Sequence, residues 1–393
     1  MKKPSVYLDG AANTPISKTV VDAMKPFLKP GYVGNSKSVH SYGIIADRAI
    51  EETRESIAAI LGTDVKETLF TSGATEGNNW AIKMTVLPFL TSGQPVHIIC
   101  GALEHDSVLN SCKQMESFGC HVDYVLPKHG ARYTAKDIKP YIRSETKLIC
   151  IAAVNNELGI RNDAESIIKE AQRHKIKTLI DCTQLVGYGG KSLRIGELFK
   201  KATFMTFSAH KIYGPTGVGC FICRDPDILP LICAGSQEFG KRGGTSNTAG
   251  IVGMGAAIKE LSEIGDLGDQ YSKLYSYLMS SLKLELPEIK CNIRPDHSNI
   301  ISLNCSAYCS YEKLATILAW DGFAVSGGSA CTEEVDETKG GFNGSHVLLG
   351  IGLSEPEIRN TIRVSFIKTT TTKDIDMLVN ELKEARNVFN YEN

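Results

Sequence analysis

Residues 147–184 read KLICIAAVNNELGIRNDAESIIKEAQRHKIKTLIDCTQ, and this stretch decides the fold. Apolar runs open the segments 147–159 and 178–184, and such runs are typical of strands that are buried on both faces of a sheet. The segment 164–175 between them has the apolar spacing of an amphipathic helix. A strand, a helix and a second strand in this order predict two parallel strands joined by a helical crossover.

The same alternation continues on both sides of this unit. We expect further strands over 67–73, 97–103, 121–126, 204–211 and 218–224, and further helices over 75–87 and 106–119. The pattern predicts an α/β protein with a mostly parallel sheet covered by helices on both faces. After about residue 260 the pattern changes, and helices over 274–286 and 311–322 with strands over 299–305 and 361–366 predict a smaller α+β domain.

Composition excludes several classes of protein. A length of 393 residues is too great for one ordinary core and predicts two domains. The net charge of −1 argues against nucleic acid as a partner, and the absence of a long apolar run argues against a membrane span. With no secretory signal after the first lysines, we expect a cytoplasmic protein whose twelve cysteines are free thiols. Cys220 and Cys223 would face opposite sides of a strand, so we expect no metal site there.

Polar residues gather where the predicted strands end. They are Asn155, Asn156, Asp181, Gln184 and the run 208–211. Ligands of parallel sheets bind beyond the carboxyl ends of the strands, so this placement predicts a site there.

Three features of these strand ends suit pyridoxal phosphate (PLP). Lys211 closes a buried strand, and a lysine amine forms a Schiff base with an aldehyde such as that of PLP. Asp181 offers the carboxylate that the pyridine nitrogen of PLP needs. SGATE, at 72–76, places backbone N–H groups at a strand-to-helix turn, which is where a phosphate group binds. Taken alone, each feature also has an ordinary explanation, as a surface lysine, a turn residue or a helix cap.

Seven short motifs occur in one order along the chain: TSGATE, LEHDSV, VNNELG, DCTQ, SAHKIYGPTGVG, KRGGTSN and SGGSACT. This ordered set resembles the cysteine desulfurases of the NifS/IscS type, which are fold-type-I PLP enzymes of the class V aminotransferase family. The likeness runs from YLDGAANT to TIRVSF. It implies a large domain at 15–260, with a mostly parallel seven-stranded sheet between helices, and a small domain formed by 1–14 and 261–393. It also implies a homodimer whose active sites are shared between subunits.

The resemblance gives a role to each matching residue. Lys211 would hold PLP and move protons, Asp181 would face the pyridine nitrogen, and His105 would stack on the ring and shuttle a proton. The other cofactor-binding residues would be Ala74, Thr75, Asn156, Gln184, Ser208, His210 and, from the second subunit, Thr245. Arg363 would grip the substrate carboxylate, assisted by Asn35 and Asn156. Asn155 remains an alternative to Asn156, because strand alternation turns only one of two adjacent side chains toward the ring.

Cys331, in SGGSACT, distinguishes a desulfurase from its relatives. The resemblance implies that its thiolate attacks the sulfur of bound L-cysteine, so that L-alanine leaves and Cys331 carries a persulfide. Glycines before it and acidic residues after it place this thiol on an exposed loop at about 326–345. From there the sulfur would pass to an acceptor protein such as an iron–sulfur scaffold, or toward tRNA thiolation.

Two positions depart from the family pattern. Ser36 stands where the family has a proline after Gly-Asn, and the segment after Cys331 is longer and more acidic than in typical members. We expect the acidic residues to select the acceptor protein. Two other functions stay open: a selenocysteine lyase or aminotransferase on the same fold, and a catalytically silent partner protein.

Overall fold

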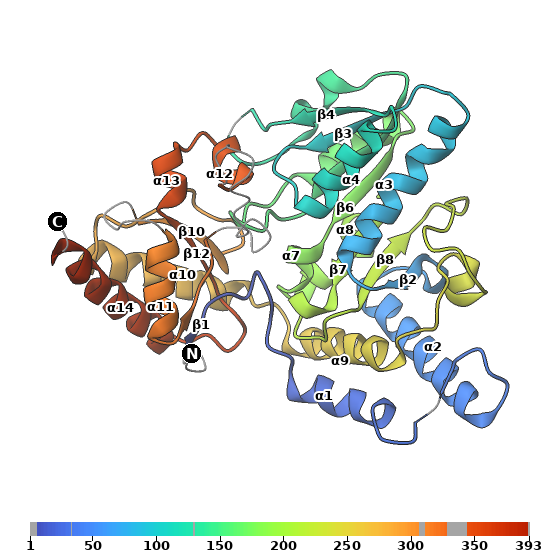
Figure 1. Ribbon diagram of the computed structural model, residues 1–393, viewed down its shortest axis with the longest axis horizontal. Helices are drawn as coiled ribbons and strands as arrows, with labels where there is room; N and C mark the ends of the chain where they lie inside the picture. Colours follow the sequence, from blue (N-terminus) through green and yellow to red (C-terminus); the bar gives the residue numbers. More distant parts are fainter. Residues whose placement is uncertain (1–5, 33, 129, 306–310, 328–343, 392–393) are drawn as a thin grey trace. The chain divides into compact units, whose positions relative to one another are not determined.

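The computed structural model describes the backbone of residues 6–32, 34–128, 130–305, 311–327 and 344–391 (Figure 1). The chain divides into two compact units. The large unit comprises Pro15–Val154 and Asn162–Asp266, and the small unit comprises Met1–Thr14, Asn155–Arg161 and Leu267–Asn393. The short segment Asn155–Arg161 therefore belongs to the small unit, although both segments that flank it belong to the large one.

A seven-stranded sheet forms the centre of the large unit, in the order β2-β8-β7-β6-β5-β3-β4. Its strands are β2 (Thr68–Thr71), β3 (His97–Gly101), β4 (His121–Val125), β5 (Thr146–Ala152), β6 (Lys177–Asp181), β7 (Phe204–Ser208) and β8 (Gly219–Cys223). β8 runs antiparallel to both of its neighbours, and the remaining pairings are parallel. The mostly parallel α/β sheet expected from the sequence is confirmed.

The large unit also contains helices, several of which pack on this sheet. They are α1 (Lys18–Met24), α2 (Ser41–Leu61), α3 (Ala74–Thr91), α4 (Asp106–Glu116), α5 (Ala135–Ile138), α6 (Ala164–Arg173), α7 (Thr183–Val186), α8 (Ile195–Leu198) and α9 (Thr248–Ile264). Short 3₁₀ turns lie at Lys25–Phe27, Val65–Glu67, Lys139–Tyr141, Gly190–Leu193, Ala209–Lys211 and Gln237–Gly240. α3 contacts β6, β7 and β8, and α4 contacts α3, β3 and β4, so α3 and α4 lie side by side (Figure 1).

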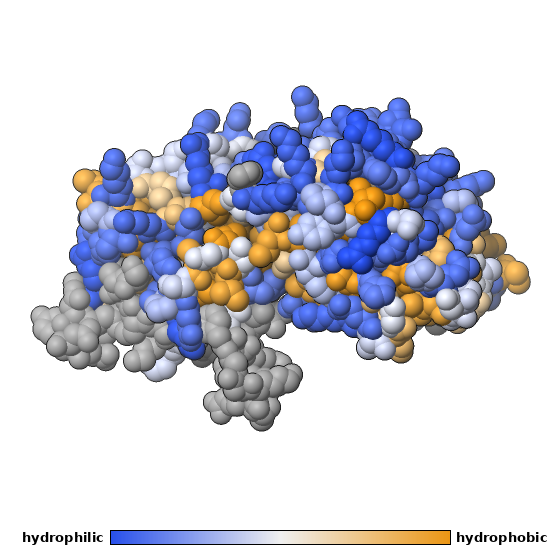
Figure 2. Space-filling view, turned by 90° about the horizontal axis from the view of Figure 1, so that it is seen from above, coloured by the Kyte–Doolittle hydropathy of each residue, from blue (hydrophilic) through white to orange (hydrophobic). Residues whose placement is uncertain are grey.

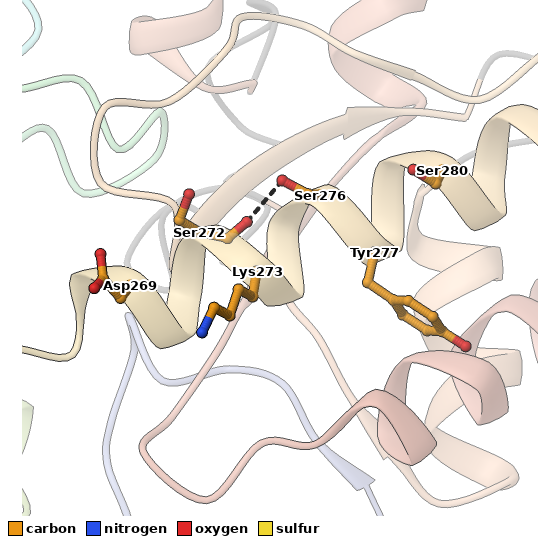
Figure 3. Close-up of a pocket in the computed structure, with 6 residues that line it drawn as sticks. All are labelled: Asp269, Ser272, Lys273, Ser276, Tyr277 and Ser280. Carbon is orange, nitrogen blue, oxygen red and sulfur yellow. Dashed lines mark hydrogen bonds between the residues drawn. The ribbon is translucent and has the colours of Figure 1, made fainter.

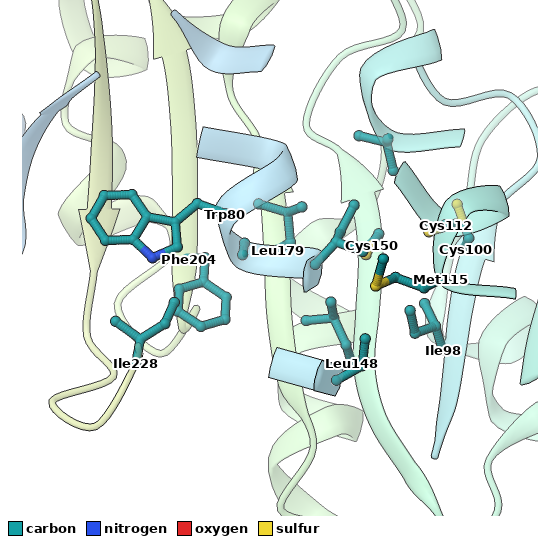
Figure 4. Packing of buried hydrophobic residues seen from close by; sticks show 14 of the residues in the cluster. Trp80, Ile98, Cys100, Cys112, Met115, Leu148, Cys150, Leu179, Phe204 and Ile228 are labelled. Carbon is teal, nitrogen blue, oxygen red and sulfur yellow. The ribbon is translucent and has the colours of Figure 1, made fainter. Parts of the chain in front are cut away.

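Aromatic and sulfur-containing side chains fill the core between these helices and the sheet (Figure 4). The indole of Trp80 lies 4.9 Å from the ring of Phe221, and Phe204 stacks on Phe221 at 5.6 Å. Trp80 is fully buried, and its Nε1 donates to the carbonyl of Leu229 at 2.7 Å. This core holds α3 in a fixed position over the sheet, which matters because the first turn of α3 lies at the candidate site.

The small unit contains two smaller sheets. An antiparallel sheet has the order β12-β10-β9, and a parallel pair joins β1 to β11. The elements are β1 (Val6–Tyr7), α10 (Gly268–Glu285), β9 (Lys290–Cys291), β10 (Ile300–Asn304), α11 (Tyr311–Trp320), β11 (Phe323–Ala324), α12 (His346–Gly350), α13 (Glu355–Arg359), β12 (Thr361–Ser365) and α14 (Thr372–Tyr391). α10 packs against α14, and ion pairs such as Lys383–Glu285 at 2.6 Å connect the two helices.

The surface is largely polar on the face shown in Figure 2, with smaller apolar patches between the hydrophilic side chains. Within the described part of the chain, none of the helices combines the length and the apolar character that a membrane span requires.

Three predicted strands end three or more residues earlier than expected, and for two of them a side chain near the end explains why. The strand expected over 178–184 ends at Asp181, whose Oδ1 accepts the N–H of Thr183 at 2.9 Å as α7 begins. The strand expected over 147–159 ends at Ala152. Beyond it, the Oδ1 of Asn155 accepts two backbone N–H groups and closes a turn. The strand expected over 204–211 ends at Ser208, so Lys211 lies in a 3₁₀ turn.

Candidate active site

Asp181 ends β6 with its side chain 8% exposed. Asn78 Nδ2 donates to its Oδ2 at 2.8 Å, and the backbone N–H of Thr183 donates to its Oδ1 at 2.9 Å. Two neutral donors from different elements therefore orient both oxygens of a buried carboxylate. Such a carboxylate fits the role of partner to a cationic ring nitrogen.

His105 caps the N-terminus of α4 and is partly exposed. Its Nδ1 accepts the backbone N–H of Ser107 at 3.1 Å and also lies 2.9 Å from Ser107 Oγ. The residue before it, Glu104, is buried, and burial raises the pKa of its carboxyl well above the usual range, with the charge of Asp181 adding to the effect. The imidazole is thus held by the start of its own helix, and it directly follows a buried acid whose pKa is raised.

The start of α3 offers a site for an anion. Its N-cap residue, Gly73, gives no side-chain hydrogen bond to the helix, and the N–H of Ala74 donates to Ser208 Oγ at 2.8 Å. Gly219 permits this contact, because a Cβ there would lie 2.5 Å from the Cα of Gly73. Thr75 follows and is exposed. A helix start without a side-chain cap, beside a serine hydroxyl, fits a phosphate group.

The first turn of α3 also contains an acidic residue, Glu76, whose negative charge is balanced by Arg242. Glu76 accepts the N–H of Ser72 at 2.7 Å and pairs with Arg242 at 2.9 Å. Burial opposes ionisation, but the bonds from Arg242 and Ser72 hold the pKa of Glu76 below its usual range. The charge of Glu76 is therefore neutralised by Arg242 and leaves the helix start suitable for an anion.

His210 and Lys211 lie in the 3₁₀ turn that follows β7, and both are partly exposed. Burial, with a smaller effect from the charge of Lys211, lowers the pKa of His210 to about 4. The imidazole is therefore neutral at physiological pH and has one N–H to donate. The lysine and the imidazole follow the strand that also carries Ser208.

Three other predicted site residues of the large unit, Gln184, Thr245 and Asn35, lie in a short helix or in loops. Gln184 is partly exposed in α7, three residues after Asp181. Thr245 is exposed between the turn at 237–240 and α9. Asn35 is exposed, and its Oδ1 accepts the N–H of Lys37 at 3.0 Å, so this oxygen closes a turn.

The predicted substrate residues Arg363 and Asn156 meet within the small unit. Arg363, on β12, is 2% exposed; its Nη1 donates to the carbonyl of Asn156 and its Nη2 to Asp9 Oδ1, each at 3.1 Å. Its Nε is buried and finds no hydrogen-bond partner among the described residues. A buried guanidinium whose Nε–H has no hydrogen-bond partner among the described residues is suited to bind a carboxylate ligand.

The structure also distinguishes Asn155 from Asn156. Asn155 is buried, and its Oδ1 accepts the N–H groups of Glu157 and Leu158 at 2.9 Å each. Asn156 is partly exposed. Strand alternation does not apply to the pair, because β5 ends at Ala152. Since the Asn155 oxygen is used in the turn, Asn156 is the better candidate for ligand binding.

Cys331 and most of the loop predicted at 326–345 lie outside the described residues, but both ends of that loop are described. Ser326 exchanges two backbone hydrogen bonds with Arg363, at 2.6 and 3.2 Å. Ser345 caps α12 and donates to Glu157 Oε2 at 2.5 Å, and both side chains are buried. The two ends therefore attach to Arg363 itself and to the neighbour of Asn156.

One residue with a central place in the site, Asn78, was missed by the sequence analysis. It is fully buried and contacts Asp181, Ser107 and Thr206. The only sequence signal was a pair of adjacent amides, Asn78 and Asn79, directly before Trp80. Such an amide needs buried partners, but the sequence does not show which ones.

A shallow pocket of about 570 Å³ lies elsewhere, along α10 (Figure 3). Its lining residues are Asp269, Ser272, Lys273, Ser276, Tyr277 and Ser280. None of them was predicted as a site residue, and they share one face of a surface helix.

Comparison with known proteins agrees with this geometry. The family model of the class-V aminotransferases matches residues 6–378, and the chain belongs to this family. The family consists of PLP enzymes, and within it the chain is similar to cysteine desulfurases. A cysteine desulfurase IscS of Dictyoglomus turgidum is 36% identical over 390 residues, covering 97% of this chain and 94% of the relative. The human cysteine desulfurase is 35% identical, covering 95% of this chain and 80% of the relative.

Solved structures similar to this chain include proteins of the same kind. A NifS-like protein superposes with a TM-score of 0.85 at 29% identity, covering 98% of this chain and 99% of its own. SspA in complex with cysteine superposes with a TM-score of 0.76 at 32% identity, covering 93% of this chain and all of its own. The fold type expected from the sequence motifs is confirmed.

Proposed function

We propose that this chain is a cysteine desulfurase. It converts L-cysteine and the thiol of Cys331 into L-alanine and a Cys331 persulfide, and then passes the sulfur to an acceptor protein. The proposal rests above all on the buried, doubly hydrogen-bonded carboxylate of Asp181 at the end of β6, in a chain similar to cysteine desulfurases over nearly its whole length.

The residues of the large unit fit PLP. Asp181 supplies an oriented carboxylate for the ring nitrogen, and Lys211 supplies the amine for the aldehyde. The uncapped start of α3 with Ala74 and Thr75, together with Ser208 and His210, supplies donors for the phosphate. Thr245 of a second copy of the chain would complete this set, since it is exposed here. When bound, PLP supplies an electron sink for negative charge at the α-carbon of an amino acid.

The protein side chains then have defined tasks. The Lys211 amine takes the proton from Cα of cysteine and returns it, while the Asp181 carboxylate keeps the ring nitrogen protonated. His105 would stand beside the ring of bound PLP and would move a second proton, and Gln184 would donate to the cofactor's phenolic oxygen. Arg363 binds the substrate carboxylate through its unused donor capacity, with Asn156 and Asn35 completing the substrate contacts.

The sulfur-transfer step belongs to Cys331. Its thiolate attacks the sulfur of the bound cysteine, so that a sulfur–sulfur bond forms and the bond between Cβ and sulfur breaks. The electron pair of the broken bond stays with the carbon skeleton, which takes up a proton and leaves as alanine. No outside oxidant or reductant is needed for this step.

The test is anaerobic incubation of the PLP-loaded protein with L-cysteine. Wild type should release alanine and gain one sulfur atom in mass on Cys331. Cys331→Ser should gain no sulfur and release little alanine, and Lys211→Ala should lose the visible absorption of bound PLP. Equal alanine release by wild type and Cys331→Ser would point to an aminotransferase or lyase reaction and would refute the proposal.

The acceptor is a separate part of the proposal. The segment 333–341 carries four acids and one lysine, which favours a basic acceptor surface, such as one on an iron–sulfur scaffold. Deleting 333–341 should leave alanine release with a small-molecule reductant unchanged and should slow transfer to the scaffold. Equal loss of both activities would contradict this role.

A further inference from the structure

Asn78 connects Asp181 with the start of α4, the two places to which the proposed function assigns contacts with the cofactor ring. Its Nδ2 donates to Asp181 Oδ2 at 2.8 Å and to Ser107 Oγ at 2.9 Å, while its Oδ1 accepts the hydroxyl of Thr206 at 2.7 Å. These partners come from β6, α4 and β7, so a single amide on α3 joins three other elements. Both hydrogens of the amide nitrogen are in use.

The orientation of this amide is determined by its surroundings. A carboxylate oxygen only accepts hydrogen bonds, so the group that faces Asp181 must be the NH₂ end of Asn78. Rotating the amide by half a turn would bring its oxygen against the carboxylate. Asn78 is fully buried, so bulk solvent would not compensate such a contact.

The same orientation fixes Ser107 and, through it, His105. Because Ser107 Oγ accepts from Asn78, its own hydrogen is directed to His105 Nδ1, 2.9 Å away. The backbone N–H of Ser107 donates to the same nitrogen at 3.1 Å. Nδ1 therefore receives two hydrogen bonds, and a neutral His105 carries its proton on Nε2.

Close packing brings Asn78 to this position. A Cβ on Gly77 would lie 2.7 Å from Cγ2 of Thr206, so the absence of a side chain at Gly77 allows α3 to approach β7. At this separation the Asn78 side chain reaches the end of β6 and the start of α4 together.

We propose that Asn78 is a positioning residue that holds the Asp181 carboxylate and the His105 imidazole in one arrangement for the cofactor ring. The inference rests on the proposed function for the roles of Asp181 and His105. It goes beyond that function, because it assigns a role to a residue that acts on the cofactor through Asp181 and His105. Loss of the Asn78 side chain should weaken PLP binding even when no substrate is present.

The experiment compares Asn78→Ala with a matched buried amide, Asn162→Asp. Asn162 also lies in the large unit, donates to the carbonyl of Ala152 at 2.8 Å and accepts from the N–H of Tyr133 at 2.9 Å, but it contacts neither Asp181 nor His105. For both variants, PLP dissociation from the apoprotein, the visible absorption band of bound PLP and urea unfolding of the apoprotein are measured.

We expect Asn78→Ala to raise the PLP dissociation constant about tenfold or more, the effect of losing one hydrogen bond to a charged group, and to shift the visible band. Asn162→Asp should weaken folding and leave both cofactor properties within about twofold of wild type. If Asn78→Ala also left both cofactor properties unchanged, Asn78 would be a structural residue and the proposal would be overturned.

An exchange variant covers the case in which Asn78→Ala does not fold. In the double variant Asn78→Asp/Asp181→Asn the donor and the acceptor change places, and the hydroxyls of Thr206 and Ser107 can both donate to the new carboxylate. Folding should approach wild type, while the visible band should not, because the negative charge stands at the wrong residue. A wild-type band in this variant would overturn the proposal.

These measurements use PLP without substrate. A wild type that binds PLP but makes no alanine from cysteine would therefore refute the proposed function and leave the result for Asn78 intact.

Discussion

Ser345 donates a hydrogen bond to Glu157 at 2.5 Å, and both side chains are buried in the small unit. Ser345 follows the segment that contains Cys331, and Glu157 adjoins Asn156. The end of the loop that carries the proposed sulfur acceptor is therefore tied to the turn that carries Asn156, a proposed substrate residue.

Replacing Ser345 by alanine should impair the sulfur step more than cofactor binding. The change leaves a buried carboxylate without this donor and should lower the free energy of unfolding by about 1–3 kcal/mol. Persulfide formation on Cys331, followed by mass spectrometry, should slow while PLP affinity stays unchanged. Ser354→Ala is the control, since Ser354 caps α13 at the surface and should cost about 1 kcal/mol with no effect on persulfide. Equal rates of persulfide formation in Ser345→Ala and Ser354→Ala would contradict the role of Ser345 as an anchor of the loop.

Arg363→Lys should act mainly on substrate binding. Lysine keeps the charge but cannot place several N–H groups in one plane, so KM for L-cysteine should rise by about tenfold or more. Steady-state alanine release measures KM and kcat separately. Arg359→Lys is the matched control, because Arg359 is exposed and pairs with Glu355 on the same helix. An unchanged KM in Arg363→Lys would remove this arginine from the substrate site.

Arg54 and Glu238 form a buried ion pair that should contribute strongly to stability. The Nη1 of Arg54 lies 2.7 Å from Glu238 Oε2, and Arg54 is 2% exposed. Removing the cation leaves Glu238 buried without it, so Arg54→Ala should lower the free energy of unfolding by about 3–5 kcal/mol. The exposed pair of Arg194 with Glu197 is the comparison, and Arg194→Ala should cost less than about 1 kcal/mol. Urea unfolding of the apoprotein measures the free energy of unfolding of both variants, and equal losses in the two would contradict a strong contribution from the buried pair.

Stability should also fall in mild acid because of His297. Burial, and then the charge of Arg161, lowers the pKa of this histidine to about 4, against an ordinary value of 6.5. Between these values the unfolded chain binds a proton that the folded chain does not, so stability is full above pH 6.5 and decreases as the pH falls toward 4. The loss should reach about 3 kcal/mol at most.

The measurement for His297 is urea unfolding at several pH values for wild type and His297→Gln. Carboxyl groups titrate in both proteins, so the difference between the two curves isolates the histidine. Parallel curves between pH 6.5 and 4 would show that His297 is not the cause.

Local patterns were sufficient to predict the sheet, since apolar runs such as 147–152 become strands buried on both faces. Strand ends were harder to predict, because single side chains set them: Asn155 closes a turn with its own oxygen. The predicted residues Asp181, His105 and Ser208 lie on elements that the pattern identified. Asn78 was not predictable, because its partners Ser107, Asp181 and Thr206 are 29, 103 and 128 residues away along the chain.

The small unit is assembled from three separate stretches of the chain, and this has a consequence for folding during synthesis. Most of the large unit has left the ribosome once Asp266 is made, so its sheet can form early. Asp9, however, pairs with Arg363, which is made 354 residues later. The stretch around Asp9 therefore cannot complete its contacts until Arg363 has been synthesised, however early the sheet of the large unit forms.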